Sequence, residues 1–138
     1  MKIAIETIVN ADINTVWAAW NSPEDIKKWN AASDDWHTTE SSVDLRVGGR
    51  FSSRMEAKDG SMGFDFKGTY SKIVENELVE YTLEDERTAS VAFEKVEDGV
   101  KVTESFEAES ENDPEMQRLG WQNILDNFAR YVEAKDQS

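Results

Sequence analysis

Residues 113–135 read DPEMQRLGWQNILDNFARYVEAK, and no other stretch of the chain has so clear a helical pattern. Asp113 can cap the first turn, and Pro114 suits the first helical position because its missing N–H would have no partner there. At about 100° per residue, the apolar residues fall on one face of this helix. That face consists of Gly120, Trp121, Ile124, Leu125, Phe128, Tyr131 and Val132. Burying so broad a face requires an equally broad partner surface, which the rest of the chain is expected to build.

The first 35 residues predict one strand followed by two short helices. Residues 3–9, IAIETIV, are rich in β-branched side chains and mostly alternate, as a strand does. Asp12 can cap a helix that presents Val16 and Trp17 on an apolar stripe. Ser22 and Pro23 are typical of a second helix start.

From residue 36 to residue 109 the apolar pattern changes to period two, interrupted by short turn sequences. Turns are predicted at residues 48–49, 59–60, 75–77 and 98–99, where glycine or asparagine occurs. The strands expected between them span residues 36–40, 43–47, 51–57, 64–74, 78–84, 89–96 and 100–107. Strands joined by short turns pair antiparallel. The predicted fold class is therefore α+β, a single domain over residues 1–138 with helices on one face of an antiparallel sheet.

The chain is strongly acidic, with a net charge of −14 and a pI near 4.4. This charge argues against binding of nucleic acid or of an anionic membrane surface, because both favour a basic face. The absence of cysteine excludes disulfides, a thiol nucleophile and cysteine-ligated zinc. With no apolar run of about 18 residues and no basic leader, we expect a soluble, cytoplasmic, monomeric protein without membrane insertion.

Sequence signatures of catalysis, metal binding and cofactor binding are not found. His37 is the single histidine, it lies in the polar run HTTES, and no nucleophile motif accompanies it. Metal-ligand spacings, phosphate loops and dinucleotide fingerprints are also missing. We therefore predict no catalytic residue, no metal and no cofactor, although a carboxylate in a cavity could still act as an acid or base.

Three residues break the apolar pattern at positions where a cavity could form. In an unbroken last strand, Glu104 points inward beside Val102 and Phe106, so its carboxylate must be paired, hydrated or protonated. A bulge or a lysine partner is the ordinary explanation, and a polar group on the wall of a wet cavity is the functional one. Gln117 is a similar anomaly on the long helix. Gly120 indicates close packing by another element, the more common reason for such a glycine, or room for a ligand.

The aromatic content is high enough to line an apolar pocket, although filling a core is the more common role of aromatic residues. Phe64, Phe66 and Tyr70 share one face of their strand by alternation. The candidate ligand-binding residues are Trp29, Trp36, Phe51, Phe64, Phe66, Tyr70, Tyr81, Phe93, Glu104, Phe106, Gln117, Gly120, Trp121, Ile124 and Phe128.

Several local motifs resemble one known family over essentially the whole chain. They are the segments VWAAW at 16–20, DLRVGGRF at 44–51, KGTY at 67–70 and the pair Gly120-Trp121, together with Pro23-Glu24 and Trp29. In these motifs the chain resembles the START-like, or SRPBCC, superfamily, and within it the AHSA-like family related to the C-terminal domain of the heat-shock-protein-90 ATPase activator. The resemblance implies a helix-grip fold: a curved antiparallel sheet of six to seven strands around a long C-terminal helix, with two short helices after the first strand.

The resemblance also implies a cavity between that helix and the sheet, of the kind that binds lipids, sterols, polyketides or aromatic compounds. Three functions follow as expectations. The first is binding of a small hydrophobic ligand. The second is a co-chaperone-like module whose partner is a heat-shock ATPase, and the third is a cyclase or hydrolase that uses Glu104 or Tyr70 for proton transfer. Stress-associated or toxin-associated roles are the remaining expectation. The fold alone does not select among these functions.

Overall fold

Seven antiparallel strands form one sheet in the computed structural model, which describes residues 2–136. The strands are β1 (Lys2–Val9), β2 (Trp36–Val43), β3 (Arg50–Ala57), β4 (Gly63–Val74), β5 (Leu78–Leu83), β6 (Thr88–Val96) and β7 (Gly99–Glu107). Their order in the sheet is β1-β7-β6-β5-β4-β3-β2, so each strand from β2 to β7 pairs with the next one along the chain. The first strand pairs with the last, so β1 and β2 are the two edges of the sheet.

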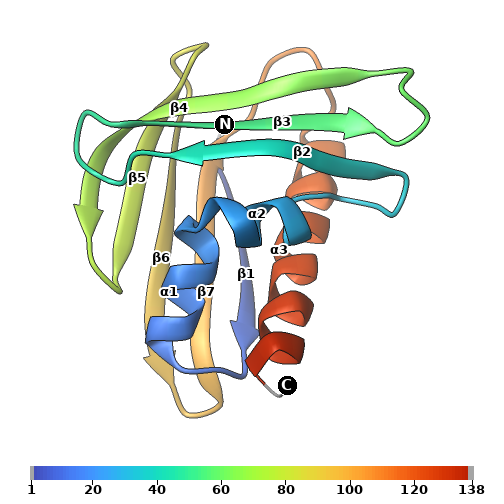
Figure 1. The fold of residues 1–138 in the computed structure, drawn as a ribbon. Helices are drawn as coiled ribbons and strands as arrows, with labels where there is room; N and C mark the ends of the chain where they lie inside the picture. Colours follow the sequence, from blue (N-terminus) through green and yellow to red (C-terminus); the bar gives the residue numbers. More distant parts are fainter. Residues whose placement is uncertain (1, 137–138) are drawn as a thin grey trace.

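Three helices lie on the concave side of this sheet: α1 (Ile13–Asn21), α2 (Pro23–Trp29) and α3 (Pro114–Asp136). Figure 1 shows the sheet bending, so that β2, β3 and β4 run across one end of the molecule above the helices. The predicted α+β helix-grip fold is confirmed. None of the helices within residues 2–136 combines the length and the apolar character needed to cross a bilayer.

One part of the strand prediction is wrong. Residues 36–40 and 43–47 were expected to form two strands, but the structure has the single strand β2, which ends at Val43. A bulge between Thr38 and Glu40 shifts the register of β2 against β3, and alternation alone cannot show where a strand continues through a bulge. The segment after Val43 is a turn, in which Arg46 Nε donates to both carboxylate oxygens of Asp44 at 2.8 and 3.0 Å.

The long helix begins as its sequence predicts and is fastened to two other elements. Asp113 accepts a hydrogen bond of 2.9 Å from the backbone N–H of Glu115, which is the expected cap. Farther along α3, Gln122 donates to the backbone carbonyl of Glu6 in β1 at 3.1 Å. Asn127 donates to the carbonyl of Trp29 at the end of α2 at 2.8 Å. These side-chain bonds fix how α3 lies against the sheet.

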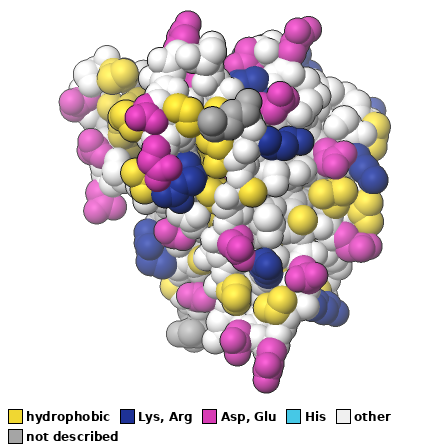
Figure 2. Space-filling view, turned by 180° about the vertical axis from the view of Figure 1, so that it is seen from behind, with side chains coloured by type: hydrophobic (Ala, Val, Ile, Leu, Met, Phe, Trp, Pro, Cys, Tyr) yellow, Lys and Arg dark blue, Asp and Glu magenta, His cyan; other side chains and the backbone are white. Residues whose placement is uncertain are grey.

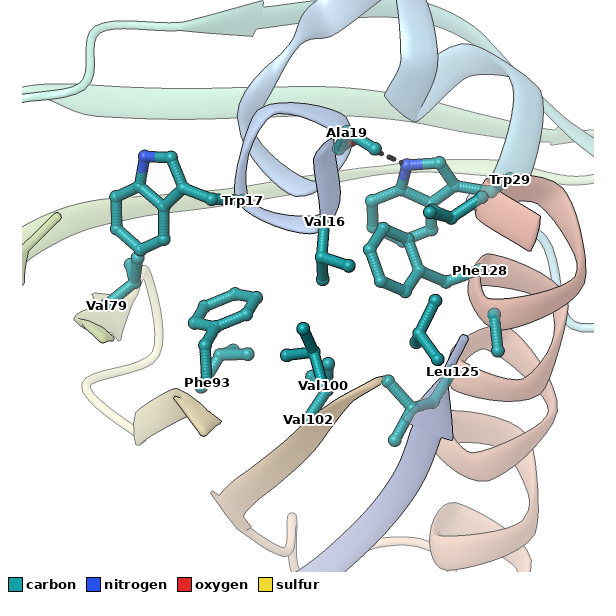
Figure 3. Packing of buried hydrophobic residues seen from close by; sticks show 14 of the residues in the cluster. Val16, Trp17, Ala19, Trp29, Val79, Phe93, Val100, Val102, Leu125 and Phe128 are labelled. Atoms are coloured by element: carbon teal, nitrogen blue, oxygen red, sulfur yellow. Dashed lines mark hydrogen bonds between the residues drawn. The ribbon is translucent and has the colours of Figure 1, made fainter. Parts of the chain in front are cut away.

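The hydrophobic core lies between α1, the C-terminal half of α3 and the strands β1, β6 and β7 (Figure 3). Phe128 is fully buried, and its ring centre lies 4.9 Å from those of both Trp20 and Trp29. The indole N–H of Trp29 donates to the carbonyl of Ala19 at 2.9 Å, so its one polar atom is satisfied. Phe93 packs edge-on against Trp17 in the same core.

A second set of side-chain hydrogen bonds joins the C-terminal turns of α3 to α2. The carboxylate of the buried Asp25 accepts hydrogen bonds from the Tyr131 hydroxyl at 2.5 Å and from Lys135 Nζ at 2.7 Å. Burial alone raises the pKa of Asp25, but the hydrogen bonds from Lys135 and Tyr131 outweigh it and hold the pKa below its ordinary value. The carboxylate is therefore ionised at neutral pH and holds the two helices together.

Candidate functional site

A cavity of about 360 Å³ lies between α3, the end of α2 and the inner face of the sheet. Its volume is at the lower end of the range for small-molecule sites. Helix α3 contributes Gln117, Trp121 and Ile124, and α2 contributes Ile26 and Trp29. The lining extends from the buried Glu104 to Phe64, which is 47% exposed, so the cavity reaches the surface.

Aromatic rings form a continuous wall on the sheet side of the cavity. The ring of Phe51 lies at the centre, 4.9 Å from that of Tyr81, 5.4 Å from that of Tyr70 and 5.7 Å from that of Phe66. Phe66 in turn contacts Trp121 of α3 at 5.9 Å between ring centres. The wall therefore spans from β5 across β4 and β3 to the helix.

Predicted ligand-binding residues divide into two groups in the structure. Trp29, Phe51, Phe64, Phe66, Tyr70, Tyr81, Glu104, Gln117, Trp121 and Ile124 line the cavity. The other five predicted residues do not. Phe93 and Phe128 point into the hydrophobic core (Figure 3). The ring of Phe106 stacks on that of Trp121, with 3.9 Å between the ring centres. The ring centre of Trp36 lies 5.9 Å from that of Phe64. Gly120 is on α3, next to Trp121 in the sequence.

Glu104 is a carboxylate that the fold holds in an apolar environment. In β7 it pairs with Ile5 on one side and Val91 on the other, in an unbroken register, and it is 5% exposed. Among the described residues, 2–136, no hydrogen bond or ion pair reaches its carboxylate. The two ordinary explanations, a bulge and a lysine partner, are therefore both wrong, and Glu104 lies on the cavity wall.

Burial raises the pKa of Glu104 to about 8, because removal from water penalises the charged carboxylate. Two phenols share this environment. Burial, with a smaller contribution from the Asp44 charge, raises the pKa of Tyr70 to about 12. Burial, and then the nearby Glu104, also raises the pKa of Tyr81 well above its ordinary value. At neutral pH the cavity therefore presents a largely protonated carboxyl group and two neutral hydroxyl groups.

Comparison with known proteins assigns the family. The family described as Activator of Hsp90 ATPase homolog 1-like protein matches residues 10–133, which is most of the chain. The chain belongs to this family. A search of curated proteins gave no significant match.

Solved structures agree with that assignment. The AHSA1-like protein from Aeromonas hydrophila is 50% identical, with a TM-score of 0.93 over 100% of this chain and 96% of its own. A protein from Cytophaga hutchinsonii is 44% identical, with a TM-score of 0.83 over 97% of this chain and 93% of its own. A protein from Chromobacterium violaceum, 24% identical over 96% of this chain and 98% of its own, has a TM-score of 0.86 and shows the shared fold alone.

In this AHSA1-like chain, Gln117 has a structural role that the sequence does not reveal. Its side-chain amide donates to the carbonyls of Glu109 at 3.1 Å and Asn112 at 2.9 Å. Its side-chain oxygen accepts from the N–H of Glu109 at 2.8 Å. Gln117 thereby ties the start of α3 to the segment that follows β7, and these bonds hold its amide at the cavity rim.

Other cavity residues of this AHSA1-like chain escaped the sequence analysis. Trp20, Met55 and Arg87 line the cavity together with Asn21, Ile26, Asn30, Val43, Ser53, Val79 and Glu109. Arg87 precedes β6 in a turn, where an arginine looks like any solvated charge. Trp20 lies on α1 and Ile26 on α2, and a helical pattern does not separate the side that meets a cavity from the side that meets the core. Within residues 2–136, no cluster of three His, Cys, Asp or Glu side chains could hold a metal ion.

Gly120 of this AHSA1-like chain does not contact another element closely, so the expected close packing is wrong. A Cβ atom placed on Gly120 would meet no atom within 4 Å. The glycine instead leaves open space beside Trp121. Because glycine in a helix interior costs about 1 kcal/mol relative to alanine, Gly120→Ala is expected to raise the free energy of unfolding by about that amount. Urea denaturation followed by tryptophan fluorescence measures it.

A second glycine provides the control for this prediction. Gly99 has φ of +138°, and a Cβ there would lie 2.1 Å from the carbonyl oxygen of Val9. Gly99→Ala is therefore expected to destabilise the protein, in contrast to Gly120→Ala. A lower stability of the Gly120→Ala variant would show that this part of α3 tolerates no added atom.

Proposed function

We propose that this protein binds a small hydrophobic ligand in the cavity between α3 and the sheet. The observation that carries the proposal is the aromatic-walled cavity of about 360 Å³, because apolar pockets of this size with a few polar groups are typical ligand sites. A volume at the lower end of the range favours a compact aromatic compound over a sterol or a long-chain lipid. Glu104 and the two tyrosines supply the polar contacts that would orient such a ligand.

The proposal predicts that filling the cavity abolishes binding without unfolding the protein. Ile124 lies on α3 and lines the cavity, so Ile124→Trp would place a large ring in the ligand space. Leu119→Trp is the matched control, because Leu119 lies on the same helix, is 49% exposed and does not line the cavity. Naphthylmethanol, a flavonoid, a sterol and a fatty acid are suitable probes in a thermal-shift screen, followed by calorimetric titration.

Wild-type protein and the Leu119→Trp variant should bind the same compound, and the Ile124→Trp variant should bind it at least about tenfold more weakly. Equal binding by all three proteins would place the ligand outside the cavity. Failure of every compound to bind wild-type protein would remove the support for this function.

The family match favours a second candidate function. The family is described by its likeness to an activator of the Hsp90 ATPase, and the match covers residues 10–133. A co-chaperone-like activity would therefore appear as a faster ATPase rate when the protein is added to an Hsp90-type chaperone. An unchanged rate, together with no co-purification of the two proteins, would exclude it.

A further inference from the structure

The inner part of the cavity holds a carboxylate that the protein leaves without a partner. Among residues 2–136, no fully enclosed side-chain nitrogen or oxygen lacks a hydrogen bond. Glu104 has no hydrogen bond, so its carboxylate oxygens are not fully enclosed by protein. The side chain is only 5% exposed and lines the cavity, so its exposed part is the part that meets the cavity. The unbroken pairing of β7 with β1 and β6 fixes this direction. The polar group is thus presented to whatever occupies the cavity.

The other charged groups around the cavity do not neutralise Glu104. Arg87 also lines the cavity, but its Nε donates to Asp85 at 2.6 Å and its Nη1 to the carbonyl of Glu107 at 3.3 Å. Glu109 adds a second carboxylate to the lining. Tyr70 and Tyr81 face the same space as neutral phenols. A basic ligand would therefore find an unused counter-ion in Glu104 once its proton is released, whereas an acidic ligand would leave Glu104 protonated.

The walls and the surface favour a cation as well. The face of an aromatic ring attracts an organic ammonium group, more strongly when water is excluded. The aromatic residues Phe51, Tyr81 and Trp121 line the same cavity as Glu104. The net charge of −14 raises the local concentration of cations around the protein, and acidic side chains are spread over the face in Figure 2.

We propose that the cavity takes an organic cation, namely an aromatic amine-bearing compound whose ammonium group pairs with Glu104 while its ring lies against the aromatic wall. The inference rests on the proposed function and narrows its ligand class. It implies that binding converts Glu104 from the protonated to the ionised form, with release of the proton to solvent.

Four probes of similar size separate the ligand classes: naphthylmethylamine, naphthylmethanol, acetylnaphthalene and naphthoate. Calorimetric titration of the full chain at about pH 7.5 gives the affinity of each one. Wild-type protein is expected to bind the amine at least about tenfold more tightly than naphthylmethanol. Glu104→Gln should lose this preference while it keeps its affinity for naphthylmethanol. Glu94→Gln, an exposed position on β6, is the control and should behave as wild type.

A second measurement needs no variant. The affinity of wild-type protein for the amine should rise as the pH increases from 6 to 8, since the carboxylate becomes ionised while the amine stays cationic. The affinity for naphthylmethanol should stay constant over this range. Titrations in buffers of different ionisation enthalpy should detect proton release with the amine alone.

Tightest binding of acetylnaphthalene would overturn the inference in favour of a ligand that accepts a hydrogen bond from protonated Glu104. Tightest binding of naphthoate, or equal affinity for the amine and the alcohol, would also overturn it, while binding in the cavity would still stand. Failure of all four probes would count against the proposed function itself.

Discussion

Glu104→Gln is expected to make the free energy of unfolding independent of Glu104 ionisation, whereas that of the wild-type protein should fall as the pH rises from about 5 to 9. The pKa of this buried carboxyl group rises from its ordinary value of 4.5 to about 8 in the folded state. Between these two values the folded protein keeps a proton that the unfolded chain has released. The free energy of unfolding must therefore fall as the pH rises through this window. Integrated over the window, the loss is on the order of 4 kcal/mol.

Urea denaturation at pH 5, 7 and 9 measures this effect. At pH 5 the wild-type carboxyl group is neutral and has nearly the shape of the glutamine amide, so the two proteins should have similar stability. At pH 9 the Glu104→Gln variant should be more stable by several kcal/mol. Glu94→Gln, which changes an exposed carboxylate, should retain the wild-type pH profile. Parallel profiles for wild-type and Glu104→Gln proteins would show that Glu104 is hydrated or paired in solution.

Phe128→Ala is expected to lower the free energy of unfolding by about 3–5 kcal/mol, the usual cost of deleting a buried phenylalanine ring. Phe128 is fully buried, and its ring packs edge-on against the stacked rings of Trp20 and Trp29. The truncation would leave a cavity at the point where α1, α2 and α3 meet. Since domains of this size are stable by about 5–15 kcal/mol, the variant would lose a large share of its stability.

The matched control for this substitution is Phe64→Ala. Phe64 is 47% exposed, so its truncation should cost less than about 1 kcal/mol. Thermal and urea unfolding of both variants give the comparison. A similar loss of stability for both would mean that the Phe128 site collapses around the missing ring, and that the core is less tightly packed than the contacts indicate.

The fold was predictable because its signals are local. The cap at Asp113, the helical spacing of the apolar face of α3 and the glycine-containing turns each act within a few residues. Glu104 could be singled out because alternation places one charged residue on a buried strand face. The bulge near Thr38 has no such signal, because it depends on how β2 meets β3.

The candidate site was predictable only in part, because residue type does not separate a core from a cavity. Phe51 and Phe128 are chemically identical and both point inward, yet the first lines the cavity and the second fills the core. The difference arises from what each ring meets: Phe128 packs against Trp20 of α1 and Trp29 of α2, whereas Phe51 lies on β3 at the cavity. Periodicity gives the direction of a side chain, but not the space left in front of it.

The pairing of β1 with β7 also has a consequence for the order in which the protein can fold. β1 is synthesised before every other strand, but its partner β7 ends at Glu107 and its covering helix α3 follows later still. Ile3 and Ile5 therefore lack their native neighbours until most of the chain has been synthesised. Because β1 pairs with the strand farthest from it in the sequence, these contacts raise the contact order, which predicts slow folding that is completed after synthesis.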